Sequence, residues 1–259
     1  MRAYILTDIE GVAGVNRWEQ GGRDGDSPAK HAAMRLLTAE VNACVDGILD
    51  AAADAEVVVW DGHGNGAIVY EDLHPRARLI ARAPIAAPYL LDRGFDALYF
   101  VGQHAMAGTP GATLCHTYSS KTIEYFRLNG VPMGEFGCRA AMAGELGIPT
   151  VFVSGDDKAV AEARALVPEI AGVAVKEGLG PELALHLSAA EARARIREGA
   201  AEATRRAGTI RPVLVAPPYV LEVRYLVGQE APLRLPGNAR ALDSRTVVYS
   251  AAHTWELPM

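Results

Sequence analysis

The 259-residue chain has little of what several protein classes require. It holds only three cysteines, Cys44, Cys115 and Cys138, with no Cys-x-x-Cys pair. This argues against a disulfide framework or a cysteine zinc knuckle and favours a reducing, cytoplasmic setting. No apolar run approaches the roughly 18 residues of a membrane span, so no membrane association is expected. The formal net charge of −6 argues against nucleic-acid binding, which needs a basic face.

Short apolar runs alternate with amphipathic stretches along the first two-thirds of the chain. The runs predict strands at residues 3–6, 57–60, 97–101 and 150–154, and the stretches predict helices at 28–53, 134–146 and 156–167. Continuous apolar strands separated by helices are typical of a parallel sheet that is covered on both faces. The sequence therefore predicts an α/β fold with a mostly parallel sheet.

The pattern changes after about residue 175. A helix rich in alanine and arginine is expected at 188–207, followed by strands at 213–216, 220–226 and 246–250. These later strands predict a mixed or antiparallel extension of the sheet. We therefore expect residues 1–175 to form an α/β core and residues 176–259 to form a C-terminal α/β subdomain that completes the same unit.

Carboxylate and imidazole side chains follow three of the predicted strands. Asp8 and Glu10 follow the first strand, His63 follows the second, and His104 follows the third. Ligands of open parallel sheets bind outside the carboxyl ends of the strands, so these four side chains are expected to meet at one edge. Asp8 could instead cap a turn, and His104 could be held by structural hydrogen bonds.

Aspartate, glutamate and histidine without cysteine suit zinc, manganese or cobalt. The Asp8 carboxylate could bridge two ions about 3.5–4 Å apart, as in two-metal hydrolytic sites. Two ions need more than four ligands, and Glu135, close to a predicted helix start, is the next candidate. An ordinary first-turn acid favoured by the helix dipole is the alternative interpretation of Glu135.

His116 is the remaining candidate for chemistry, because an imidazole with a pKa of about 6.5 can act as a general acid or base. The adjacent Cys115 is interpreted as a small buried hydrophobic residue rather than a nucleophile. Asp156 and Asp157 also follow a strand, but their position at a helix start favours a helix N-cap.

Several short sequence motifs that resemble those of a single protein family are distributed over nearly the whole chain. They are DIEG at 8–11, GQHAMAG at 102–108, HTYS at 116–119, NGVPMGE at 129–135, VSGDD at 153–157 and PPYVLEV at 217–223. In this combination the sequence resembles the zinc-dependent D-aminopeptidases associated with dipeptide-transport operons. Thr7, which replaces a serine, and the glycine-rich segment 61–66 depart from that family's pattern; the second departure concerns the shape of the substrate pocket.

The resemblance implies a three-layer α/β/α sandwich and a site with two zinc ions per subunit, which manganese or cobalt could replace. The implied metal ligands, with Asp8 shared between the ions, are Asp8, Glu10, His63, His104 and Glu135. His116 would be the catalytic histidine. The family also implies short peptide substrates and a ring-shaped homo-oligomer, specifically a homodecamer.

The leading hypothesis is therefore a metal-dependent aminopeptidase that acts on short peptides, with D-residues implied by the resemblance. A two-metal phosphoesterase is a first alternative, although the sequence has no P-loop and only Lys121 and Arg139 as cations near the motifs. A non-catalytic metal- or peptide-binding protein of a transport system is a second alternative. His116 argues against it, because a pure binding site has less need of a free imidazole.

Overall fold

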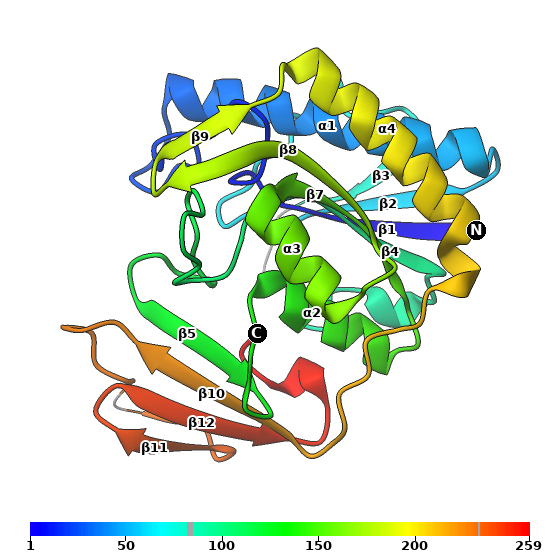
Figure 1. Ribbon diagram of the computed structural model, residues 1–259. Helices are drawn as coiled ribbons and strands as arrows, with labels where there is room; N and C mark the ends of the chain where they lie inside the picture. The colour runs from blue at the N-terminus through cyan, green and yellow to red at the C-terminus, as the bar shows by residue number, and fades with distance from the viewer. Residues whose placement is uncertain (82–84, 233) are drawn as a thin grey trace.

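The computed structural model describes residues 1–81, 85–232 and 234–259. Its main layer is a seven-stranded sheet in the order β3-β2-β1-β4-β7-β8-β9 (Figure 1). The strands are β1 (Arg2–Thr7), β2 (Glu56–Asp61), β3 (Ala77–Ile80), β4 (Ala97–Gln103), β7 (Thr150–Asp156), β8 (Ala171–Gly180) and β9 (Leu183–His186). The four strands predicted in this region, now β1, β2, β4 and β7, are confirmed.

The six strands β3, β2, β1, β4, β7 and β8 are parallel to one another, whereas β9 pairs antiparallel with β8. In the register of the three central strands, Thr7 lies opposite both Asp61 and Val101. Because β1, β2 and β4 therefore end at nearly the same level, the residues that follow them emerge at one edge of the sheet.

Helices cover both faces of this sheet, which confirms the three-layer sandwich. Helices α1 (Pro28–Ala51) and α4 (Ala189–Arg206) lie together on one face, and α2 (Glu135–Glu145) and α3 (Asp157–Leu166) lie on the other (Figure 1). A Cβ at Gly47 would stand 2.2 Å from the Arg197 carbonyl oxygen, so glycine is needed where α1 and α4 touch. No helix in these three described stretches is long and apolar enough to cross a membrane.

A second, five-stranded sheet is antiparallel and lies beside the sandwich (Figure 1). Its order is β11-β12-β10-β5-β6, with β5 (Ile123–Leu128), β6 (Val131–Pro132), β10 (Tyr219–Tyr225), β11 (Ala239–Asp243) and β12 (Thr246–Ala251). The predicted antiparallel strands 220–226 and 246–250 are confirmed as β10 and β12. They pair with each other, and β10 also pairs with β5, in a separate sheet instead of an extension of the parallel one. The division of the chain at residue 175 stays a prediction; β8 runs across that residue.

The strand predicted at 213–216 is wrong. Among the residues that the structure describes, this segment has no strand partner, and it links α4 to β10 outside either sheet. The Val213 backbone packs on α2, where a Cβ at Gly144 would stand 1.8 Å from the Val213 carbonyl oxygen. Asn129 Nδ2 donates a hydrogen bond of 2.8 Å to the Ala216 carbonyl oxygen, which occupies this acceptor without a neighbouring strand.

Candidate active site and metal centre

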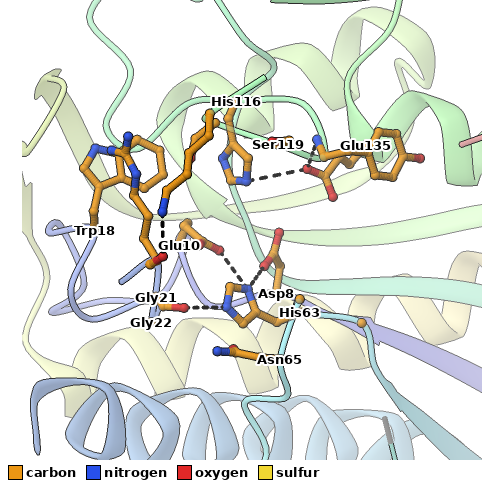
Figure 2. A pocket seen from close by; sticks show the side chains of 16 residues that line it. Asp8, Glu10, Trp18, Gly21, Gly22, His63, Asn65, His116, Ser119 and Glu135 are labelled. Carbon is orange, nitrogen blue, oxygen red and sulfur yellow. Dashed lines mark hydrogen bonds and ion pairs between the residues drawn. The ribbon is translucent and has the colours of Figure 1, made fainter. Parts of the chain in front are cut away.

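Three of the predicted ligands form a first cluster beyond the ends of β1 and β2. His63 Nδ1 lies 2.9 Å from Asp8 Oδ1 and 3.2 Å from Glu10 Oε2. His63 Nε2 lies 2.7 Å from the Gly21 carbonyl oxygen, an acceptor that places the ring proton on Nε2 when the imidazole is neutral. Figure 2 shows the three side chains pointing toward one another. The lone pair of His63 Nδ1 and the carboxylates of Asp8 and Glu10 are then all available to bind one cation.

His104, Glu135 and His116 form a second cluster next to the first. Glu135 Oε1 lies 3.4 Å from His104 Nε2 and 3.8 Å from His116 Nε2. The two imidazole rings stack with their centroids 4.0 Å apart. Their Nδ1 atoms hydrogen-bond to backbone carbonyls, that of His104 to Ala105 at 2.9 Å and that of His116 to Leu114 at 3.0 Å. Both Nε2 atoms therefore face Glu135 as acceptors or ligands.

Asp8 stands between the two clusters and faces both. Its Oδ1 approaches His63, whereas its Oδ2 lies 3.1 Å from His104 Nε2. Within each cluster, the candidate ligand atoms lie within 4.8 Å of one another. This is the arrangement that a carboxylate bridging two metal ions needs.

Burial and charge favour cations at this site. Glu10 and His104 are 4% and 2% exposed, and the buried Glu10 Oε2 and His104 Nε2 have no partner with hydrogen-bond geometry among the described residues. A buried polar atom without a partner is costly, and a bound metal ion would satisfy both atoms. The donor set therefore fits divalent metal ions.

The neighbouring protein groups lower the pKa of two of the carboxyl groups, those of Asp8 and Glu135. Burial raises the pKa of Asp8, but the adjacent imidazoles of His104 and His63 outweigh burial and hold it well below its usual value. The Glu135 pKa is lowered in the same way, with burial opposed mainly by His104. Burial lowers the pKa of His63, yet the Glu10 and Asp8 carboxylates raise it well above its ordinary value. The negative field that attracts a proton to His63 also attracts a divalent cation.

Comparison with known proteins identifies the family. The family model Peptidase M55, described as D-aminopeptidase, matches residues 1–258. This chain belongs to the M55 D-aminopeptidase family. A curated D-aminopeptidase of Bacillus subtilis (strain 168) is 30% identical over 256 residues, which cover 97% of this chain and 92% of the relative. A solved structure, the Zn-dependent D-aminopeptidase DppA from Bacillus subtilis, a self-compartmentalizing protease, matches with a TM-score of 0.89 at 26% identity, covering 99% of this chain and 93% of that one.

All six predicted site residues of this D-aminopeptidase thus lie in the two clusters. Asp61, the last residue of β2, lies outside the clusters and caps a turn, because its carboxylate accepts hydrogen bonds from the backbone of Ala67 and Ile68. Asp156 is the helix N-cap that the sequence predicted, and it accepts from the Lys158 and Ala159 amides.

Glycines bring the ligand-bearing loops of the D-aminopeptidase into contact. Gly102 has a φ of +80°, and a Cβ there would stand 2.0 Å from the Asp8 carbonyl oxygen. A Cβ at Gly11 would stand 2.1 Å from the Gln103 carbonyl oxygen. Any side chain at either position would push the loop carrying Asp8 away from the loop carrying His104.

Sequence reasoning missed the buried cation beneath the first cluster. Lys176, on β8 and 3% exposed, donates from Nζ to the backbone carbonyls of Glu10, Val12 and Val15. Glu40 on α1 holds the same loop from the other side by accepting the Ala13 amide at 2.9 Å. A lysine within a buried strand was the signal in the sequence that could have revealed this contact. A buried lysine without a carboxylate partner needs several hydrogen-bond acceptors nearby.

A cavity of about 330 Å³ opens at the candidate metal ligands of the D-aminopeptidase. Asp8, Glu10, His63, His116 and Glu135 line it, together with residues of the loop after β1 and of the segment before β5 (Figure 2). The lining residues of these two segments include Trp18, Gly21, Gly22, Arg23, Ser119, Ser120 and Lys121. The volume lies at the lower end of the range for small-molecule sites, which suits a short substrate.

Proposed function

We propose that this D-aminopeptidase removes the N-terminal D-residue of short peptides by means of two zinc ions per chain. The zinc dependence of the Bacillus subtilis relative supports the choice of metal. The single observation that carries the proposal is that the two oxygens of the Asp8 carboxylate face different clusters. Oδ1 lies 2.9 Å from His63 Nδ1, and Oδ2 lies 3.1 Å from His104 Nε2. A carboxylate with one oxygen in each cluster suits a bridging ligand.

Each cluster would hold one ion. The ligands of the first ion would be Asp8, Glu10 and His63, and those of the second would be Asp8, His104 and Glu135. Two such ions supply a lowered pKa for a water molecule and polarisation of the scissile carbonyl. Manganese or cobalt could occupy the same nitrogen and oxygen ligands.

His116 is proposed as the catalytic histidine that moves the proton. Its Nδ1–H is engaged by the Leu114 carbonyl, so Nε2 is free to accept a proton and to donate it to the departing amine. Trp18 packs edge-on against the His116 ring, with centroids 5.5 Å apart, and orients it at the cavity wall. A third ligand to the second ion is the alternative role, because Nε2 also lies 3.8 Å from Glu135.

We further propose a ring-shaped homo-oligomer, a homodecamer, in the cytoplasm. The self-compartmentalizing relative supports the assembly, and three exposed leucines on the hairpin of β8 and β9 offer an apolar surface for a second copy. They are Leu179, Leu183 and Leu185, which are 52%, 58% and 64% exposed. Three free cysteines suit a reducing compartment.

Zinc titration of chelator-stripped protein tests the metal proposal. We expect about two equivalents per chain by metal analysis. Asp8→Asn should weaken both sites, whereas Asp61→Asn, a change outside the clusters, should leave the stoichiometry unchanged. Activity is followed with D-alanyl- and L-alanyl-p-nitroanilide, and only the D-substrate should be turned over. Binding of fewer than two ions, or loss of only one ion in Asp8→Asn, would contradict a shared Asp8.

A further inference from the structure

The cavity is lined by two cations that the metal chemistry does not use. Arg23 and Lys121 both line it, together with the carboxylates of Asp8, Glu10 and Glu135. The cavity therefore carries basic as well as acidic side chains. A zwitterionic peptide has the complementary distribution, with an amine at one end and a carboxylate at the other.

The two cations differ in how much of their charge is already engaged. Lys121 Nζ lies 3.2 Å from Asp24 Oδ1 and donates to the Arg23 carbonyl oxygen at 3.1 Å. Within residues 1–81, 85–232 and 234–259, by contrast, no carboxylate lies within ion-pair distance of the Arg23 guanidinium. The guanidinium packs on the Trp18 ring, with Cζ 4.9 Å from the ring centroid, so its N–H donors remain available.

The loop that carries Arg23 is held in place from several sides. The Trp18 amide donates to Glu182 Oε1 at 3.0 Å, and Asn16 Nδ2 donates to the Glu182 carbonyl oxygen at 2.8 Å. Lys121 fixes the other end of the loop through the Arg23 carbonyl. The Arg23 backbone therefore has a defined position relative to the rest of the cavity, and Trp18 aligns its side chain.

We propose that Arg23 binds the free C-terminal carboxylate of the peptide and thereby favours substrates with an unblocked C-terminus. This inference rests on the proposed function, because it places the amino end of the peptide at the two clusters. A planar guanidinium is suited to a bidentate contact with a carboxylate.

The distances limit the length of the substrate. The Trp18 ring lies 4.9 Å from Arg23 Cζ and 5.5 Å from the His116 ring, so Arg23 Cζ is at most the sum of the two, about 10.4 Å, from His116. A guanidinium–carboxylate contact occupies roughly 3–4 Å of this span. At most about 6–7 Å then remains, which holds no more than two extended residues at about 3.3–3.6 Å each. One or two residues can therefore follow the scissile bond.

The test compares D-alanyl-glycine with its C-terminal amide, using zinc-loaded full-length protein. We expect kcat/KM to be about 10- to 100-fold higher for the free acid, the range for a charge-assisted contact. In Arg23→Gln this acid-to-amide ratio should fall to within about threefold of one. Arg23→Lys, which keeps the charge but loses the fork, should give an intermediate ratio.

Arg17→Gln is the matched control, because Arg17 is an exposed arginine of the same loop that does not line the cavity. It should keep the wild-type ratio. Peptide length is a second measurement: wild-type kcat/KM should drop beyond D-alanyl-glycyl-glycine, and Arg23→Gln should flatten this dependence.

A wild-type ratio near one, or an unchanged ratio in Arg23→Gln, would overturn the role of Arg23 while leaving the peptidase assignment intact. Failure of the zinc-loaded protein to cleave D-alanyl-p-nitroanilide as well as both peptides would instead overturn the proposed function and this inference with it.

Discussion

Lys176 offers the sharpest test of how the fold supports the metal site. Its Nζ is the donor to three backbone carbonyls, those of Glu10, Val12 and Val15, in the loop that carries two predicted ligands. Lys176→Met keeps the length of the side chain and removes every donor. Each buried carbonyl left without a donor costs about 1–3 kcal/mol.

A compensating gain limits the loss of stability. Burial lowers the Lys176 pKa from 10.5 to about 8, opposed by the charges of Asp156 and Glu40. At 1.36 kcal/mol per pKa unit, the buried charge therefore costs the fold about 3 kcal/mol, which methionine avoids. Three carbonyls together lose about 3–9 kcal/mol, so we expect the free energy of unfolding of Lys176→Met to fall by a net amount of roughly 0–6 kcal/mol.

Zinc affinity is the more specific readout, because the loop would lose its anchor beneath Asp8 and Glu10. We expect a 10- to 100-fold weaker zinc affinity, roughly the loss seen when groups that orient metal ligands are removed. Competition with a chromogenic chelator measures it, alongside urea unfolding. Lys158→Met is the control, since Lys158 Nζ contacts Asp157 and the Gly178 carbonyl, away from the ligand loop.

Lys176→Gln keeps two N–H donors and should lie between the wild type and Lys176→Met in both measurements. Zinc affinity equal to that of the wild type in a folded Lys176→Met protein would refute the reasoning. So would an equal loss of zinc affinity in Lys158→Met, because the effect would then not come from the anchor of the ligand loop.

Two further predictions concern other groups of the site. His116→Ala should retain about two zinc ions and lower kcat by about 10²- to 10⁴-fold, as for a lost general acid–base; loss of one ion in metal analysis would favour the ligand role instead. Burial raises the pKa of Glu40 to about 7 from 4.5, against the Ala13 amide and Lys176, so the folded state keeps a proton that the unfolded state releases near pH 4.5. The wild type should therefore lose about 3 kcal/mol of stability relative to Glu40→Gln between pH 4.5 and pH 8, as measured by urea unfolding; a constant difference across that range would contradict a raised pKa.

Local patterns were sufficient to predict most of the sandwich. The buried runs of β1, β2, β4 and β7 and the periodic stretches of the four helices were identified, because burial on one or both faces leaves a strong repeat in the sequence. The segment 213–216 was mispredicted because an apolar run says nothing about whether a neighbouring strand supplies hydrogen-bond partners. It packs on α2 through Gly144 instead.

The candidate ligands could be grouped from sequence because one topological rule connects them. Asp8, His63 and His104 each follow a strand, and parallel strands in register deliver their carboxyl ends to one edge. Glu135 and His116 follow no such rule: their side-chain chemistry made them candidates, and the family resemblance gave them their expected roles. Their roles stay predictions, although the structure brings both beside His104.

The sequence by itself determined the α/β class, the central strands and the residue types that can hold metal, because these depend on short-range periodicity and on side-chain chemistry. Only the tertiary structure decided that β5 leaves the core to join β10 in a second sheet, that Lys176 reaches a loop 166 residues earlier in the chain, and that Trp18 aligns Arg23 at the cavity. These contacts join segments far apart in the chain, and no local pattern encodes which distant segments will pack together.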